Sequence, residues 1–254
     1  MTIDHIGASS IISDSLTNGI FRSIGRLCAP IFLFLVVESL HHTSDKLKYT
    51  LRLYLAGATI QLLNAFTTIN FNMSIPGNIF QTFFYVSFYI CLIDAMSEKS
   101  KNINSLLCLL ALLPLLFVPI EIFLTQNNPQ LLFIANAFIP SPFSIEYSFL
   151  FVLLGISWYL CKNKYLICAI LIGFSVISYF IPVNFFFTQN LENSIFYPLY
   201  FTAFHLFTQS QWLMVFAVPF ILLYNGQKGR NMKYFFYLYY PLHQYVLYII
   251  KALG

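Results

Sequence analysis

Charged residues are scarce in this chain. Asp, Glu, Lys and Arg make up only 9% of its 254 residues, whereas soluble domains carry about a quarter. Hydrophobic residues reach 59% and aromatic residues 19%. A water-soluble fold of this size needs a polar exterior that such a composition does not supply. The shortage of charge therefore excludes an ordinary soluble domain and predicts a polytopic membrane protein.

Motifs for metal, nucleotide and nucleic-acid binding are also missing. The five cysteines form no C-x-x-C pair and have no histidine at zinc spacing, so no metal site is expected. No Walker-type sequence is present, which argues against nucleotide hydrolysis. The net charge of +4 indicates cytoplasmic loops rather than a nucleic-acid partner. The first ten residues lack the basic and apolar regions of a signal peptide, so no cleavable leader is expected.

Hydropathy divides the chain into apolar segments of about the 20 residues that a transmembrane helix needs. We expect spans near residues 25–41, 49–69, 78–96, 103–124, 144–161, 165–182, 209–224 and 234–252. The stretch 184–207 is apolar but interrupted by polar residues and Pro198, which predicts an interfacial or re-entrant segment, or alternatively a full span. The expected fold is an all-α transmembrane bundle of about eight or nine spans, forming one integral membrane domain over residues 1–254.

Basic residues gather in four short loops, 44–52, 97–101, 162–164 and 225–233. These loops hold ten of the 13 Lys and Arg residues, and the expected topology places all four on one side. The connecting segments 70–77, 125–143 and 183–208 contain none. By the positive-inside rule, the basic loops are predicted to be cytoplasmic and the protein to be a multi-pass protein of the cell membrane.

Several titratable side chains fall within or beside apolar segments, where a charge costs at least about 2.5 kcal/mol. They are Asp4, His5, Arg26, Glu38, His42, Asp94, Glu121, His205 and His243. Asp94 is expected to be solvated at the end of its span, Glu121 to be structural near Pro114 and Pro119, and His205 to lie at an interface. Such residues usually face the interior of a bundle.

The spacing of these residues restricts their partners. Glu38 and His42 are four residues apart and can pair on one helix face, in a structural or a catalytic role. Asp4 and His5 are adjacent, so their side chains diverge and each needs a partner from another helix. Arg26 is a possible partner for Asp4, and His243 for His5. From the residues alone, a neutral His243 held by a tyrosine or a carbonyl is the more frequent arrangement.

Motifs at both ends of the chain resemble one family. The segments are "IDHIG", "IGRLCAPIFLFLVVESLHHT", "KYTLRL", "NIFQT" and a final "LLYNGQKG" followed by "KYFFYLYYPLHQYVLYII". Their order is typical of the TraX family, bacterial integral membrane proteins named for the conjugative F-pilin acetylase. The residues that match its pattern are Asp4, His5, Gly25, Arg26, Pro30, Glu38, Thr43, Tyr49, Arg52, Asn78, Tyr224, Asn225, Gly226, Gly229, Tyr234, Pro241 and His243.

The chain departs from the family's pattern at two places. Members usually have an apolar lead-in before the "DH", whereas three residues precede Asp4 here, so either the first helix is short or the start lies upstream. Ser39 stands where a glycine often follows the glutamate.

The resemblance implies a membrane-embedded acyltransferase of the bacterial inner membrane. It would move an acetyl group from cytosolic acetyl-CoA to an amine or hydroxyl of a protein or glycan acceptor. Histidine suits the base, since its pKa lies near working pH. The expected catalytic residues are His243, which is preferred as the base, His5, Asp4 and Arg26. The expected substrate or cofactor contacts are Glu38, His42, Arg52, Asn78, Tyr224, Asn225, Lys228, Arg230 and Tyr239.

A non-enzymatic role is the alternative to transfer. Buried Asp, His and Arg also build proton relays, so the chain could be a small transporter or an assembly factor of a conjugation or secretion system. No internal repeat of the kind common in transporters is evident. The expected partners are the lipid bilayer, an acyl-CoA donor and a protein or glycan acceptor, with no permanently bound cofactor and no nucleic acid.

Overall fold

The computed structural model describes residues 1–9, 11–73, 75, 77–98, 101–141, 145–180, 211–227, 229–230 and 232–253. Every regular element that these residues form is helical, as predicted. They pack as two compact units, one from Met1–Leu35, Cys161–Pro182 and Thr208–Gly254, and the other from Val36–Leu160. The organisation as one domain stays a prediction, and the stretch 184–207 with His205 lies outside the described residues.

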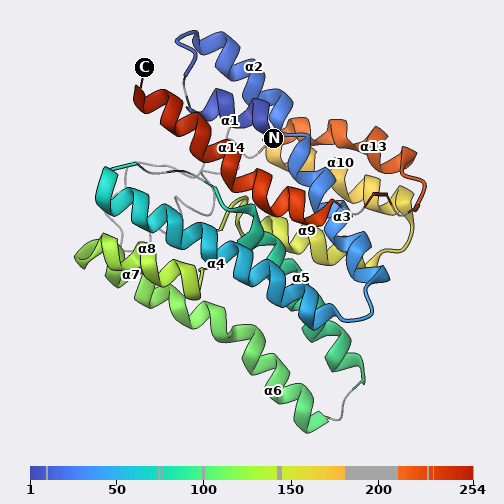
Figure 1. Ribbon diagram of the computed structural model, residues 1–254. Helices are drawn as coiled ribbons and strands as arrows, with labels where there is room; N and C mark the ends of the chain where they lie inside the picture. The colour runs from blue at the N-terminus through green and yellow to red at the C-terminus, as the bar shows by residue number, and fades with distance from the viewer. Residues whose placement is uncertain are drawn as a thin grey trace. The chain divides into compact units, whose positions relative to one another are not determined.

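The first unit joins the two ends of the chain. Its elements are α1 (Thr2–Ser9), α2 (Ser15–Gly25), the beginning of α3 (Cys28–His42), α10 (Lys164–Phe180), η2 (Gln211–Ala217), α13 (Val218–Leu223) and α14 (Lys233–Leu253). The short α1 packs against both α2 and α14, whereas α10 packs against η2 and α13 (Figure 1). The first and last helices of the chain are therefore neighbours.

Small residues allow α1 and α2 to approach closely. A Cβ added at Gly25 would lie 2.1 Å from the Asp4 Cβ, and one added at Gly7 would lie 2.8 Å from the Asn18 carbonyl oxygen. Asp14 caps the start of α2 by accepting a hydrogen bond from the Thr17 N–H at 2.9 Å. The missing side chains at positions 7 and 25 thus set the spacing of this helix pair.

The second unit is built around two long helices. These are α4 (Lys46–Phe71) and α5 (Ile79–Glu98), followed by α6 (Lys101–Leu112), η1 (Leu113–Leu116), α7 (Phe117–Asn127), α8 (Pro129–Phe138) and α9 (Ser148–Leu160). Helix α4 packs against α5 and α8, and α5 also packs against α6 and α9 (Figure 1). Pro114 lies in η1, so the helical path changes to a 3-10 turn where the sequence places a proline.

Three segments of the described residues are long and apolar enough to cross a membrane: Ser15–His42, Ile79–Ser97 and Leu106–Asn127. Four shorter apolar helices accompany them. This count corrects the expected eight or nine spans. Polar side chains such as Gln61 and Asn64 lower the hydropathy of α4, and six tyrosines, His243 and Gln244 lower that of α14.

The close approach of α1 to α2 predicts opposite effects for two Gly→Ala substitutions in the same helix. Gly25→Ala forces Asp4 and α1 away from α2, and such overpacking typically costs about 1–3 kcal/mol. Gly19→Ala adds a methyl group to open space and raises helix propensity, worth up to about 1 kcal/mol. Thermal unfolding in detergent, followed by circular dichroism, measures both. A Gly25→Ala protein as stable as Gly19→Ala would contradict the observed packing.

Candidate functional site

The two histidines singled out at opposite ends of the sequence lie together in the first unit. His5 on α1 and His243 on α14 have ring centroids 5.0 Å apart with the ring planes at 62°. Both residues are buried, with 8% and 7% of their surface exposed. The packing of α1 on α14 therefore brings together side chains that are far apart in sequence.

His243 keeps one ring nitrogen without a partner. Its Nδ1 lies 2.7 Å from the Tyr239 carbonyl oxygen, and a carbonyl only accepts, so Nδ1 carries a proton. Its ring stacks on Tyr239 at 5.0 Å and 16° and meets the edge of Tyr240 at 5.9 Å. The carbonyl contact expected for a held histidine is present, but Nε2 is buried and makes no hydrogen bond.

His5 is held by a residue that the sequence did not single out. The side-chain amide nitrogen of Gln244 lies 3.0 Å from His5 Nε2, and Gln244 is only 1% exposed. The Thr2 hydroxyl and the Tyr239 hydroxyl, 2.7 Å apart, form a second link between α1 and α14. Two polar contacts thus orient α1 and its histidine relative to α14.

Asp4 forms its ion contact with Arg22 rather than with the expected Arg26. Arg22 Nη1 lies 3.9 Å from Asp4 Oδ1. At the end of α2 the Arg26 N–H donates to the Ser23 carbonyl at 3.3 Å, which is the i to i−3 bond of a 3-10 turn. The side chains of Arg22 and Arg26 are therefore not one regular α-helical turn apart. Arg26 is 8% exposed, and its Nε has no hydrogen-bond partner.

Six buried polar atoms among the described residues of this unit make no hydrogen bond. They are Asp4 Oδ1, Arg26 Nε, His243 Nε2, Gln244 Oε1, Asn18 Oδ1 and Gln211 Oε1. Buried polar atoms are paired in the great majority of cases, and each exception calls for an explanation. The first three belong to residues predicted to be catalytic. Together they provide hydrogen-bond acceptors and one cationic donor, which suits a substrate that carries an O–H or N–H and a polarised carbonyl.

The loop after α13 has the turn that its glycines predict. Gly226 has φ +72°, a conformation that favours glycine. The Lys164 ammonium donates to the Tyr224 carbonyl, and the Tyr224 ring meets the edge of Phe34 at 5.3 Å. Asn225 and Arg230 are exposed, whereas Lys228 lies outside the described residues.

A basic pocket lies in the second unit at the start of α4. It has a volume of about 480 Å³, and its lining includes His42, Asp45, Lys48 and Arg52. Lys48 Nζ is 2.9 Å from Asp45 Oδ2, and Arg52 Nε donates to the Lys48 carbonyl at 3.2 Å. The Lys48 backbone N–H and side chain hold the pKa of Asp45 below its usual value.

Two further predicted contacts belong to the second unit. Glu38 Oε2 and His42 Nε2 are 3.7 Å apart, the pairing expected from their spacing. Asn78 is 5% exposed and donates through Nδ2 to the Gly57 carbonyl at 2.8 Å. This hydrogen bond joins the start of α5 to α4, so the visible contact of Asn78 is structural.

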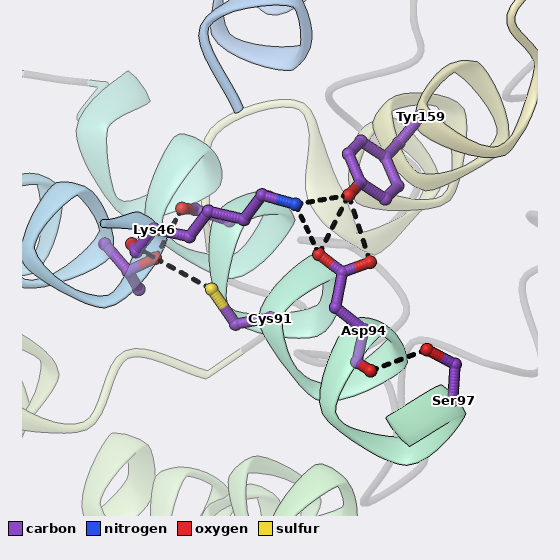
Figure 2. A network of polar contacts seen from close by, with 7 residues as sticks. Lys46, Cys91, Asp94, Ser97 and Tyr159 are labelled. Carbon is purple, nitrogen blue, oxygen red and sulfur yellow. Dashed lines mark hydrogen bonds and ion pairs between the residues drawn. The ribbon is translucent and has the colours of Figure 1, made fainter. Parts of the chain in front are cut away.

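Asp94 is paired, which differs from the expectation that it is solvated. Figure 2 shows Lys46 and Tyr159 pointing toward its carboxylate. Lys46 Nζ lies 2.5 Å from Asp94 Oδ2 and 2.6 Å from the Tyr159 hydroxyl, which in turn donates to Asp94 Oδ2 at 2.8 Å. Partial burial lowers the pKa of Lys46, but these hydrogen bonds outweigh it and raise the pKa overall.

His41 completes this network by stacking on Tyr159, with ring centroids 4.4 Å apart and planes at 9°. The network joins the start of α4 to α5 and α9. It therefore fixes the helix start that also lines the basic pocket.

The described residues form a helical fold with three segments long and apolar enough to span a membrane, and one unit contains a buried histidine pair. The chain matches the family model described as TraX protein over residues 1–251, and it belongs to the TraX family. No curated protein and no solved structure gives a match.

Sequence reasoning assigned no role in a site to Arg22, Gln244, Lys46 or Tyr159. Gln244 stands directly after His243, and Arg22 precedes Arg26 by one turn, so both were visible as neighbours of predicted residues. Lys46 belongs to a loop whose basic residues already had an explanation in the membrane topology. Its pairing with Asp94, 48 residues away, has no local signal.

The network around Asp94 predicts unequal costs for removing two neighbouring lysines. Lys46→Met leaves a partly buried carboxylate without its cation and is expected to cost about 1–2 kcal/mol. Lys48→Met removes a pair whose lysine side chain is 80% exposed and should cost less than about 1 kcal/mol. Thermal unfolding in one detergent compares them. Equal stabilities would show that the Lys46 contacts contribute nothing beyond a surface ion pair.

Proposed function

We propose that this protein is a membrane-embedded acyltransferase that moves an acetyl group from acetyl-CoA to an amine or hydroxyl acceptor. The observation that carries the proposal is that Nε2 of His243 is buried and has no hydrogen-bond partner. The His243 and His5 ring centroids are 5.0 Å apart, and two arginines belong to the same unit. A buried imidazole with one nitrogen bonded and the other available is the arrangement that a general base needs. Membership of the TraX family agrees with this chemistry.

In the proposed reaction, His243 accepts and returns a proton, and the bonds that form and break all belong to the two substrates. Nε2 takes the proton from the acceptor N–H or O–H while that nitrogen or oxygen bonds to the acetyl carbonyl carbon. The C–S bond of the thioester then breaks, and the leaving thiolate takes the proton from His243. The Nδ1–H bond to the Tyr239 carbonyl keeps the ring oriented and stabilises it while it is positively charged.

The arginines of the site are the proposed electrophilic groups. Negative charge develops on the acetyl oxygen during attack, and a preorganised cation in a dry site stabilises it. Arg26 is buried with Nε available, so it suits this role. Arg22 contacts Asp4, which would hold that guanidinium near α1. Asp4 thus positions a cation rather than accepting the acceptor's proton.

Two of the basic loops, 44–52 and 225–233, are the proposed contacts for the donor. The phosphates of acetyl-CoA require cations, and the pocket of the second unit offers Arg52 and Lys48, with His42 beside them. The loop with Asn225 and Arg230, in the first unit, is a separate candidate for these contacts. We propose that these loops face the cytosol, where acetyl-CoA is found, and that the protein resides in the bacterial inner membrane.

The central test removes the proposed base. His243→Gln keeps a polar side chain but no basic nitrogen, and transfer of labelled acetyl from acetyl-CoA by the purified protein should fall about 10²–10⁴-fold. The acceptor panel contains a peptide amine, a glycan hydroxyl and a lipid headgroup. Gln126→Ala, which removes an exposed polar residue of α7, should retain transfer. Normal turnover by His243→Gln would remove His243 from the mechanism, and no transfer by wild type to any acceptor would favour the transporter or assembly role.

A second prediction concerns the donor. Arg52→Ala removes a cation from the basic pocket, so the KM for acetyl-CoA should rise about tenfold while kcat stays near the wild-type value. Lys162→Ala removes an exposed cation of another basic loop and is the matched control. Steady-state kinetics with varied acetyl-CoA measure both. Equal KM values for the two variants would place the donor phosphates elsewhere.

A further inference from the structure

We propose that Gln244 is a positioning residue that fixes the tautomer of a neutral His5 by occupying its Nε2, so that the two histidines of the site have different roles. His5 is the fixed, uncharged ring, and His243 is the ring that exchanges a proton. The identification of His243 as a base rests on the proposed function. The assignment of the His5 tautomer does not.

The geometry at His5 fixes where its proton lies. The Gln244 side-chain nitrogen, 3.0 Å from His5 Nε2, is an amide nitrogen and can only donate. His5 Nε2 therefore accepts through its lone pair, and a neutral ring with that lone pair in use carries its proton on Nδ1. Gln244 is 1% exposed, so water does not compete for the contact.

At His243, in contrast, the basic ring nitrogen has no hydrogen-bond partner. Its Nδ1 donates to the Tyr239 carbonyl at 2.7 Å, so its Nε2 holds the lone pair of the neutral ring. That atom is buried and makes no hydrogen bond. Both rings thus carry the proton on Nδ1, but only in His5 is the basic nitrogen already engaged.

The surroundings of His5 also disfavour a positive charge on its ring. The charged and titratable groups around it are Asp4 and the Met1 amino group of α1, Arg22 and Arg26 at the end of α2, and Tyr240 and His243 of α14. The cations outnumber the single carboxylate. Two imidazolium rings with centroids 5.0 Å apart would also repel each other. A neutral His5 therefore leaves His243 free to accept a proton.

Gln244→Leu removes the donor at similar side-chain volume and is the main test. Nitrogen-15 NMR of histidine-labelled protein in lipid, with His5 assigned by comparison with His5→Asn, reports the tautomer without any turnover. In wild type, His5 should remain neutral with Nδ1–H across about pH 5 to 8. In Gln244→Leu, His5 should stay neutral but populate both tautomers, because nothing then holds the lone pair on Nε2. Gln81→Leu, which removes a buried glutamine of the second unit, should leave the His5 signals unchanged.

The outcomes separate this inference from the proposed function. A wild-type His5 that is protonated at Nε2, or identical ring spectra for wild type and Gln244→Leu, would overturn the role of Gln244 even if transfer is active. The expected tautomer in a protein without transfer would keep the role of Gln244 and reject the acyltransferase. If Gln244→Leu fails to fold, Gln244→Met replaces it, and the wild-type spectrum alone still tests the tautomer.

Discussion

The close packing of α1 determines the rest of the candidate site. This helix has only eight residues, and helices of that length are marginal by themselves in water. Its position depends on Gly7 and Gly25, which let it approach α2, and on polar contacts from Thr2 and His5 to α14. Because α1 carries both Asp4 and His5, a shift of this helix would separate all the other site residues from them.

The site combines stabilising contacts with unsatisfied groups. His5, the Tyr239 carbonyl and the Thr2 hydroxyl all have partners, and these contacts orient the rings. His243 Nε2 and Arg26 Nε have none, although both are buried. An unsatisfied buried polar group costs about 1–3 kcal/mol, and natural proteins tolerate such costs mainly where function requires them. The contrast between oriented rings and available atoms is what distinguishes this cluster from an ordinary polar core.

The second unit shows a different use of polar residues in an apolar setting. The carboxylate of Asp94 receives hydrogen bonds from Lys46 and Tyr159, and the Asn78 side-chain nitrogen donates to a helix carbonyl. These contacts tie α4 to α5 and α9 and hold the helix start that lines the basic pocket. The second unit also has buried oxygens without a hydrogen bond, at Asn78 and Asn136, but the first unit differs in that its unpaired atoms include an imidazole and a guanidinium nitrogen.

The sequence by itself predicted the helical membrane class and the family, and it singled out His5 and His243. Amino-acid composition indicates whether the surface faces water or lipid, and local motifs indicate the family. Both can be read without knowing how the helices pack. Only the tertiary structure decided that Arg22 rather than Arg26 meets Asp4, that Gln244 bonds to His5 and that Lys46 neutralises Asp94. Gln244 and His5 are 239 residues apart in the sequence. Such contacts depend on how the helices pack, which hydropathy and residue spacing do not predict.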